Sequence, residues 1–177
     1  MTARAPGRAD DAPDDARDPG AGSATGLLAD PRLTAVGLLL ETAGGLSSRL
    51  ATHLAQHDLA SAEFEVLLRI ARTPGQAMRM TDLAAQTLLT TSGITRVVDR
   101  LERDSLVERR ACPTDRRGAF AAITDEGLGR LNEVLPEHLE LVEKWFTGLL
   151  PSEDLDALLT RLRTVRDGVR PDATAGA

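Results

Sequence analysis

Apolar residues along most of the chain recur at spacings of three and four, the period of a helix with one buried face. The first such stretch begins at Asp30-Pro31, an N-cap followed by proline at the first helical position. Ser61, Thr81 and Thr124 are placed to cap later helices. The pattern therefore predicts helices over about 30–57, 61–72, 82–87, 91–104, 124–150 and 152–170.

The helical period gives way to two short strand-like runs, Leu106–Arg110 and Ala119–Ile123, which we expect to form a hairpin with residues 112–118 (CPTDRRG) as its loop. Two short helices separated by a few residues precede them, which is the helix-turn-helix pattern. The predicted fold class is mainly α with a small β-hairpin. It comprises a winged helix-turn-helix domain over residues 61–124 and a helical dimerisation region over residues 30–60 and 125–170.

The two ends of the chain differ from its middle. The terminal helices have longer apolar stripes than a core of this size needs, so we expect a homodimer that buries them; an intramolecular bundle is the alternative. Residues 1–29 and 171–177 have no apolar period and are rich in small residues, proline and aspartate. Both segments are predicted to be disordered tails, with a short helix from Leu27 onward as an alternative within the first.

Composition narrows the class of protein. Aromatic residues make up 2% of the chain and tyrosine is absent, which leaves Leu, Val and Ala to fill a mainly helical core. The single cysteine, Cys112, excludes an internal disulfide and is compatible with a reducing compartment. The sequence has no secretory signal and no run of roughly 18 apolar residues that could span a membrane. We therefore expect a cytoplasmic protein without a membrane partner.

The helix over 91–104 has one apolar and one polar face. On a helical wheel its apolar residues, Ile94, Val97, Val98 and Leu101, fall in one sector, and the opposite side has Ser92, Arg96, Asp99, Arg100 and Arg103. Hydroxyl side chains stand near its N-terminus, where free backbone amides favour phosphate, and Arg96 is placed to reach a guanine edge. A solvated amphipathic helix would show the same pattern, so this helix alone does not establish DNA binding.

The predicted hairpin loop strengthens the case for DNA. Arg116 and Arg117 stand side by side at its tip, and a protruding guanidinium can enter a narrow minor groove. Asp115 could orient one of them. In the alternative interpretation, the loop is a solvated turn in which Asp115 and Gly118 only serve turn geometry. The helix and the arginine-bearing loop together favour a DNA-binding surface.

Net charge at first argues against nucleic acid, because the chain carries −6 at neutral pH. Residues 76–120, however, carry +2, and the rest of the chain carries −8. An acidic scaffold with one locally basic face would repel DNA except through that face. Overall acidity is therefore compatible with a double-stranded DNA partner.

Residues 30–168 resemble the MarR family of winged helix-turn-helix regulators. The resemblance rests on SGITRVVDRLERDSLVERR (92–110), PTDRRGAFAAIT (113–124) and the following DEG (125–127). It implies a dimer with interlocked terminal helices, two winged domains and a pseudo-palindromic operator. It also implies that Arg117 reaches the minor groove while Ser92, Thr95 and Arg96 face the major groove. Many members are repressors released by small anions, often aromatic or phenolic, that bind between the dimerisation and DNA-binding parts.

The expected DNA-contacting set combines the helix, the hairpin and the resemblance. It consists of Thr81, Thr90, Thr91, Ser92, Thr95, Arg96, Arg100, Arg109, Asp115, Arg116 and Arg117. Three positions depart from the family pattern. Ser105 stands where glycine is usual, which predicts a left-handed serine after the helix. Cys112 replaces a common aspartate in the wing, and the first helix has no tryptophan, Trp145 being the only one in the chain.

Other chemistry is less well supported by the sequence. His53 and His57 are four residues apart and could bind a metal, but no third ligand stands at a usable spacing, so no metal or cofactor is expected. His53, His57, Arg69 and Arg72 are instead candidates to bind an anionic effector. Cys112 is either a redox-sensitive thiol beside arginines or an incidental small residue.

No nucleophile-base order, glycine-rich phosphate loop or paired-carboxylate site stands out, so we do not expect an enzyme. We expect a sequence-specific transcriptional regulator, specifically a ligand-responsive repressor. The alternative is a dimeric helical protein–protein adaptor that has the winged fold but does not bind DNA.

Overall fold

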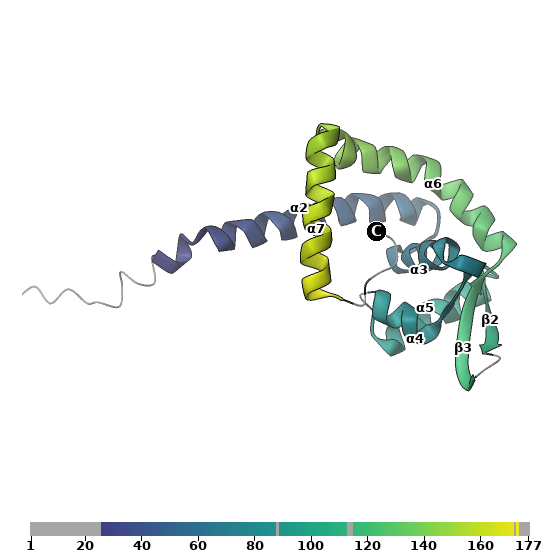
Figure 1. The fold of residues 1–177 in the computed structure, drawn as a ribbon. Coiled ribbons are helices and arrows are strands. Elements are labelled where there is room, and N and C mark those ends of the chain that lie inside the picture. Colours follow the sequence, from purple (N-terminus) through teal and green to yellow (C-terminus); the bar gives the residue numbers. More distant parts are fainter. Residues whose placement is uncertain (1–25, 88, 113–114, 172, 174–177) are drawn as a thin grey trace, which may run out of the picture. The chain divides into compact units, whose positions relative to one another are not determined.

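The computed structural model describes residues 26–87, 89–112, 115–171 and 173, with backbone only for residues 112 and 115–118. The chain divides into two compact units, Met1–Thr42 and Ala43–Ala177, and helix α2 belongs partly to each. The mainly helical fold class with a small sheet is confirmed (Figure 1). The helices are α2 (Pro31–Gln56), α3 (Ser61–Arg72), α4 (Met80–Gln86), α5 (Thr91–Arg103), α6 (Asp125–Trp145) and α7 (Ser152–Val169); the strands are β1 (Ala77–Arg79), β2 (Val107–Cys112) and β3 (Asp115–Ile123).

The predicted disordered tails fall mostly outside this description. Residues 1–25, 172 and 174–177 are not described, and residues 26–28 of the predicted N-terminal tail are helical. In the parts of the chain that are described, no helix combines the length and the apolar character needed to cross a membrane.

Helix starts were predicted with mixed success. Asp30 caps α2 as expected, its carboxylate accepting the Arg32 backbone N–H at 2.8 Å. Ser61 was a wrong prediction for α3, because Ala60 occupies the cap position and Glu63 supplies the acceptor for its N–H at 2.9 Å. Thr81 is also not a cap, since α4 already begins at Met80 and Thr81 lies in its first turn.

Within the described residues the sheet has three antiparallel strands in the order β1-β3-β2, so the predicted two-stranded hairpin was incomplete. The third strand, β1, pairs with β3 by setting Met78 opposite Ala121. A strand of three residues is too short to show the alternation by which strands are predicted. The hairpin is also longer than predicted, because β2 continues to Cys112 and β3 begins at Asp115.

One core holds the winged unit together. The whole apolar stripe predicted for α5 is buried, and it packs with side chains from α3, α4, β2, β3 and α6. The largest fully buried side chains are Leu54, Leu67, Ile70, Leu83, Ile94, Leu101, Val66, Val98, Val107 and Val134. Burial of one face of α5 leaves its polar face to solvent.

The junction after α5 fixes where the hairpin starts. Ser105 has a left-handed backbone (φ 60°), as predicted for a residue at the usual glycine position. Its N–H donates to the Glu102 carbonyl (3.0 Å) and the next N–H, of Leu106, donates to Leu101 (2.8 Å), the pattern of a Schellman motif. Thr124 then donates its hydroxyl to the Ser105 carbonyl at 2.7 Å. The end of α5, the start of β2 and the start of α6 are therefore joined at one point.

Candidate nucleic-acid interface

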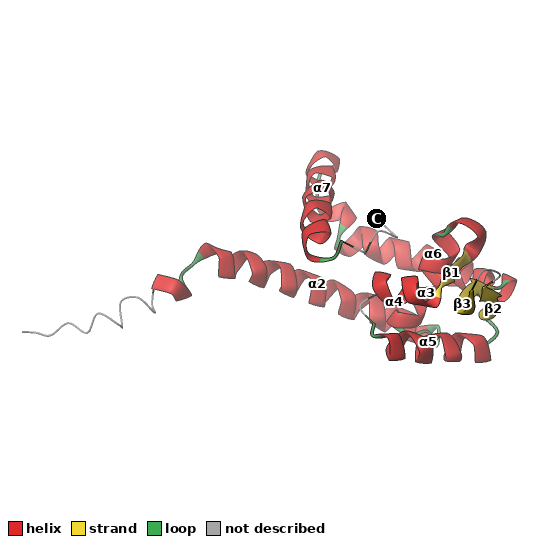
Figure 2. Cartoon of the chain, turned by 60° about the horizontal axis from the view of Figure 1, so that its bottom comes forward, coloured by secondary structure: helices red, strands yellow, loops and turns green. Residues whose placement is uncertain are grey.

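Helices α4 and α5 form the helix-turn-helix, and α5 lies along the outer side of this unit with β2 and β3 at one end (Figure 2). Thr90 caps α5, its hydroxyl accepting the Gly93 N–H at 3.1 Å and lying 3.1 Å from the Ser92 hydroxyl. Thr95 donates its hydroxyl to the Thr91 carbonyl at 2.9 Å, which holds this side chain close to the helix. The N-terminal turn of α5 therefore has a polar surface made of short side chains, and a longer side chain can project beyond it.

Arg96 is that longer side chain. It is exposed, and among the residues that the structure describes it has neither an ion-pair nor a hydrogen-bond partner. Thr91, Ser92 and Thr95 around it are exposed as well. An α-helix fits the major groove of B-form DNA, where an unpaired guanidinium can bind a guanine edge with two hydrogen bonds. This part of the predicted set forms one continuous surface.

Two other predicted DNA contacts are engaged within the protein. Arg100 pairs with Glu63 of α3, with 2.5 Å between Nε and Oε1. Arg109 of β2 pairs with Asp99 (2.6 Å) and Glu102 (2.7 Å) of α5. In this structure the two arginines therefore fasten α5 to its neighbours, a role that residue type and spacing did not indicate.

The remaining predicted contacts lie in α4 and the hairpin. Thr81 is exposed and donates its hydroxyl to Asp82 at 3.3 Å. The prediction of Arg116 and Arg117 in a loop was wrong, because both are in strand β3, which begins at Asp115. Loop length was overestimated because charged residues and glycine are unfavourable in strands on average. The side chains of residues 112–118, including Asp115 and Cys112, lie outside the described part.

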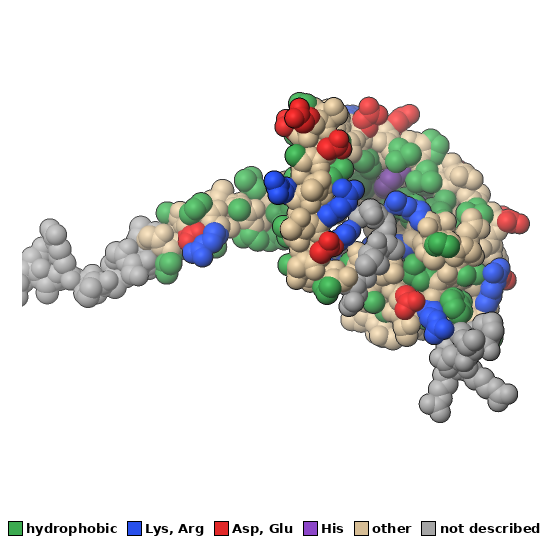
Figure 3. Space-filling model, viewed as in Figure 1, with side chains coloured by type: hydrophobic (Ala, Val, Ile, Leu, Met, Phe, Trp, Pro, Cys, Tyr) green, Lys and Arg blue, Asp and Glu red, His purple; other side chains and the backbone are tan. Residues whose placement is uncertain are grey.

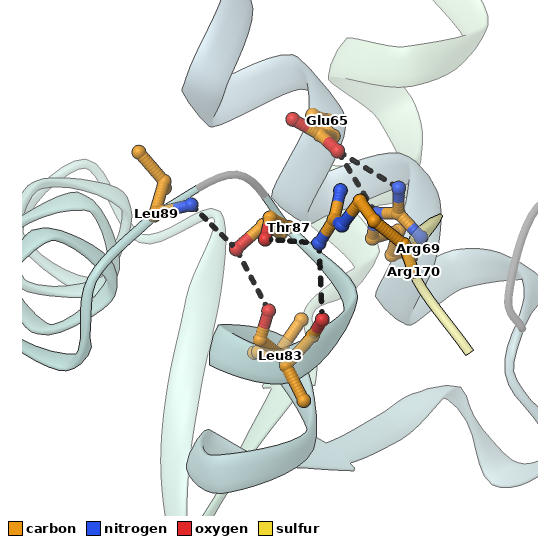
Figure 4. Close-up of polar contacts among 7 residues, drawn as sticks. Glu65, Arg69, Leu83, Thr87, Leu89 and Arg170 are labelled. Carbon is orange, nitrogen blue, oxygen red and sulfur yellow. Dashed lines mark hydrogen bonds and ion pairs between the residues drawn. The ribbon is translucent and has the colours of Figure 1, made fainter. Parts of the chain in front are cut away.

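The turn between α4 and α5 has a partner that sequence reasoning missed. Arg170, just after α7, donates to the carbonyls of Ala85 (3.1 Å) and Thr87 (2.7 Å), at the end of α4 (Figure 4). Thr87 is buried and its hydroxyl also donates to the Leu83 carbonyl at 2.8 Å. The arginine therefore supplies hydrogen bonds to carbonyls that the end of a helix leaves unsatisfied. A separation of 83 residues gives no local signal for this contact.

Two cavities border α2 and α6. The larger, about 270 Å³, is lined by Arg49, Thr52, His53, Gln56, Glu137, Leu141 and Trp145. The smaller, about 180 Å³, is lined by Ser47, Leu50, Leu54, Ser61, Phe64 and His138. Of the four residues predicted to bind an anionic effector, His53 lines the larger cavity and His57 contacts the His53 ring, with 4.9 Å between ring centroids.

The other two predicted effector residues lie elsewhere. Arg69 and Arg72 line neither of these cavities, and Arg69 pairs with Glu65 at 2.8 Å (Figure 4). His138, which the sequence did not single out, is buried against Phe64 and its ring centroid lies 5.7 Å from that of His53. Burial lowers the pKa of His138 below its usual value, and the nearby His53 lowers it further. The two cavities are therefore bordered by His53, His138 and Arg49, and not by Arg69 or Arg72.

Comparison with known proteins agrees with this geometry. The sequence model of the MarR family matches residues 57–118. The HTH-type transcriptional regulator MhqR of Bacillus subtilis is 32% identical over 120 residues, which cover 68% of this chain and 81% of MhqR. AbsC, a MarR family transcriptional regulator from Streptomyces coelicolor, aligns with a TM-score of 0.74 and 33% identity over 80% of this chain and 96% of AbsC.

A second solved structure bears on the interface. Sco3205, a MarR family transcriptional regulator from the same organism, was solved in complex with DNA; it aligns with a TM-score of 0.73 and 31% identity over 78% of this chain and 88% of Sco3205. The likeness to MhqR and AbsC extends over most of the length of both proteins. The chain belongs to the MarR family of winged helix-turn-helix transcriptional regulators.

Proposed function

We propose that this chain binds a pseudo-palindromic operator as a homodimer and acts as a ligand-responsive repressor. The observation that carries the DNA-binding part is the exposed N-terminal half of α5. There Arg96 stands among short hydroxyl side chains and has no ion-pair or hydrogen-bond partner within the described part of the chain. The DNA complex of Sco3205 supports the same mode of binding, because the likeness to it covers 78% of this chain. In the proposed complex α5 enters the major groove and Arg117 of the hairpin reaches the adjacent minor groove.

The dimer is proposed from the terminal helices, residues 30–60 and 125–170. Large apolar side chains there are exposed in the single chain; they include Leu33, Val36, Leu38, Leu39, Leu40, Leu139, Leu149, Leu150, Val165 and Val169. Figure 3 shows such side chains along the N-terminal part of α2. Exposed apolar patches of this kind mark protein–protein interfaces, and a second copy with the same stripes would cover them.

The effector is proposed to bind the cavity lined by Arg49, His53 and Trp145. Arg49 lies 3.8 Å from the centroid of the Trp145 ring, so this wall of the cavity offers both a cation and an aromatic surface. A small aromatic anion suits such a wall, because its ring can stack while its charge meets the guanidinium. The cavity lies between α2 and α6 and not among α3, α4 and α5, so the effector would act from the dimerisation region.

A salt titration of DNA binding distinguishes the proposed regulator from the alternative, a dimeric adaptor that does not bind DNA. Footprinting on the protein's own upstream region would first supply an operator fragment. We expect affinity for that fragment to fall by about tenfold or more between 50 and 200 mM salt, because neutralising phosphates releases counterions. Sedimentation at micromolar protein should give a complex containing two chains. An adaptor would show no shift of the DNA at any salt concentration.

Replacing Arg96 by alanine is expected to relax base preference and to weaken operator binding by about 1–3 kcal/mol, the usual value of one bidentate base contact. Binding-site selection on the variant should return a less defined consensus at one position in each half-site, while affinity for unrelated DNA changes little. Arg32→Ala, which removes the same charge from an exposed position on α2, is the matched control. A wild-type consensus from Arg96→Ala would contradict the placement of α5 in the major groove.

A further inference from the structure

Three potential metal ligands come together where α2 meets α6. His53 lies in the last turn of α2, His57 directly follows the end of that helix, and Glu137 comes from α6. One ligand atom from each side chain lies within 4.8 Å of the other two. The sequence offers no third ligand at a usable spacing, and the fold brings in a candidate from α6, about 80 residues further along the chain, where no local spacing rule applies.

The buried member of this cluster is oriented like a ligand. His53 is 3% exposed, and its Nε2 lies 3.4 Å from the Val134 carbonyl oxygen. A carbonyl only accepts, so in the neutral tautomer that donates Nε2–H to this oxygen, Nδ1 presents its lone pair. That Nδ1 is buried and has no hydrogen-bond partner among the described residues. Metal-binding histidines almost always donate their other N–H to such an oxygen, which fixes tautomer and ring orientation.

The spacing also suits a small divalent ion. His53 Nδ1 lies 3.7 Å from Glu137 Oε2. Bonds of about 2.0–2.2 Å from zinc to nitrogen and oxygen place neighbouring tetrahedral ligands about 3.3–3.6 Å apart. The three ligand atoms lie within 4.8 Å of one another, so they would have to close by up to about 1.2–1.5 Å to reach this spacing. His57 is half-buried and the Glu137 side chain is 60% exposed, so both have room to move.

A cationic side chain borders the site. Arg49 lines the same cavity, where its guanidinium stacks over the Trp145 ring at 3.8 Å from the centroid, and the Glu137 carboxylate offsets its charge. Two neutral imidazoles and one carboxylate form a donor set of the type that zinc, copper and nickel prefer over calcium or magnesium. Three protein ligands leave a fourth tetrahedral position for water or another small molecule.

We propose that His53, His57 and Glu137 bind a divalent transition-metal ion, with Zn²⁺ as the best match. The site would join the end of α2, immediately before α3, to the middle of α6. Metal binding would thereby hold the end of α2, which precedes the winged unit, in a fixed position against α6, which follows that unit. This proposal stands on the geometry of the three side chains and does not depend on DNA binding.

The test uses untagged full-length protein stripped of metal, with Zn²⁺ titrated against a chromogenic chelator and Co²⁺ used as a spectroscopic probe. Wild type should bind Zn²⁺ at one site per chain and give the intense visible bands of four-coordinate Co²⁺. His57→Gln and Glu137→Gln should each weaken binding at least tenfold, about 1.4 kcal/mol. Glu140→Gln, which removes an exposed carboxylate from the same helix, should leave affinity unchanged.

The proposal is overturned if wild type binds Zn²⁺ no more tightly than the double variant His57→Gln/Glu137→Gln, or if Glu140→Gln weakens binding as much as Glu137→Gln. Circular dichroism of each variant shows whether the fold is retained; both substituted side chains reach solvent, so we expect that it is. Operator binding is measured separately on the same samples. A wild-type protein that binds Zn²⁺ but does not bind the operator would count against the proposed function alone.

Discussion

Gly127→Ala should lower the free energy of unfolding by about 2–3 kcal/mol, the upper part of the range found when a packed core is forced to accept extra volume. Gly127 lies in the first turn of α6, where its N–H donates to the Thr124 hydroxyl at 3.0 Å. A methyl group there would overlap the Leu106 carbonyl oxygen and come within 2.7 Å of Ile123 Cγ1. The oxygen cannot simply move aside, because it accepts the Thr124 N–H at 3.1 Å.

The matched control for this experiment is Gly129→Ala, two residues later in the same helix. A methyl group at Gly129 would meet nothing within 4 Å, so alanine should stabilise the protein by about 0.5–1 kcal/mol through its higher helix propensity. Urea unfolding followed by circular dichroism gives both values from the transition midpoint and slope. If the two variants were equally stable, the proposed clash of a methyl group at residue 127 with Leu106 and Ile123 would be contradicted.

Glu63→Ala is the second substitution from which we expect a large effect, a loss of about 2–3 kcal/mol. One carboxylate oxygen accepts the Ala60 N–H at the start of α3 (2.9 Å), and the other binds Arg100 of α5 (2.5 Å). Loss of a helix cap costs about 1 kcal/mol, and a hydrogen bond to a charged group contributes about 1.5–3 kcal/mol. The lower part of that range applies here, because the Arg100 side chain is 43% exposed and can regain water.

Glu65→Ala provides the comparison for Glu63→Ala. Glu65 also pairs with an arginine, Arg69, but one turn away on the same helix at 2.8 Å, an arrangement that contributes only about 0.2–0.5 kcal/mol. Chemical denaturation should therefore separate the two variants by about 2 kcal/mol. A similar small loss in both would show that the link from α3 to α5 adds little to stability.

Much of this fold could be predicted because its signals are local. The α5 stripe predicts its buried face from spacing alone, and the Asp30 and Thr124 caps follow from side chains that can reach the backbone of the next turn. The left-handed backbone of Ser105 was predicted from the resemblance, because the MarR family usually has glycine at this position. In each case the residues that decide the structure stand within a few positions of one another.

The errors have the opposite cause. Strand β1 exists because β3 pairs with it, and Arg170 reaches the end of α4 from 83 residues away. Arg100 and Arg109, two of the predicted DNA contacts, also pair with carboxylates brought near by folding, and this pairing was not predicted. The metal candidate was missed for the same reason, since Glu137 faces His53 only after α6 packs on α2. Charge and exposure at such positions depend on tertiary partners, which spacing does not reveal.

The hydrogen bonds around Ser105 and Leu106, together with the ion pairs of Arg109, connect α5 to the β2-β3 hairpin, so that the two form one rigid unit. In a rigid unit the distance from the helix to the hairpin is fixed. The distance between the groove that the helix enters and the groove that the hairpin reaches is then fixed as well. In the proposed dimer, an effector would therefore act by changing the distance and the angle between the two DNA-binding units, each of which moves as a rigid body. The distance between half-sites, and not the contacts within one half-site, would be the quantity under control.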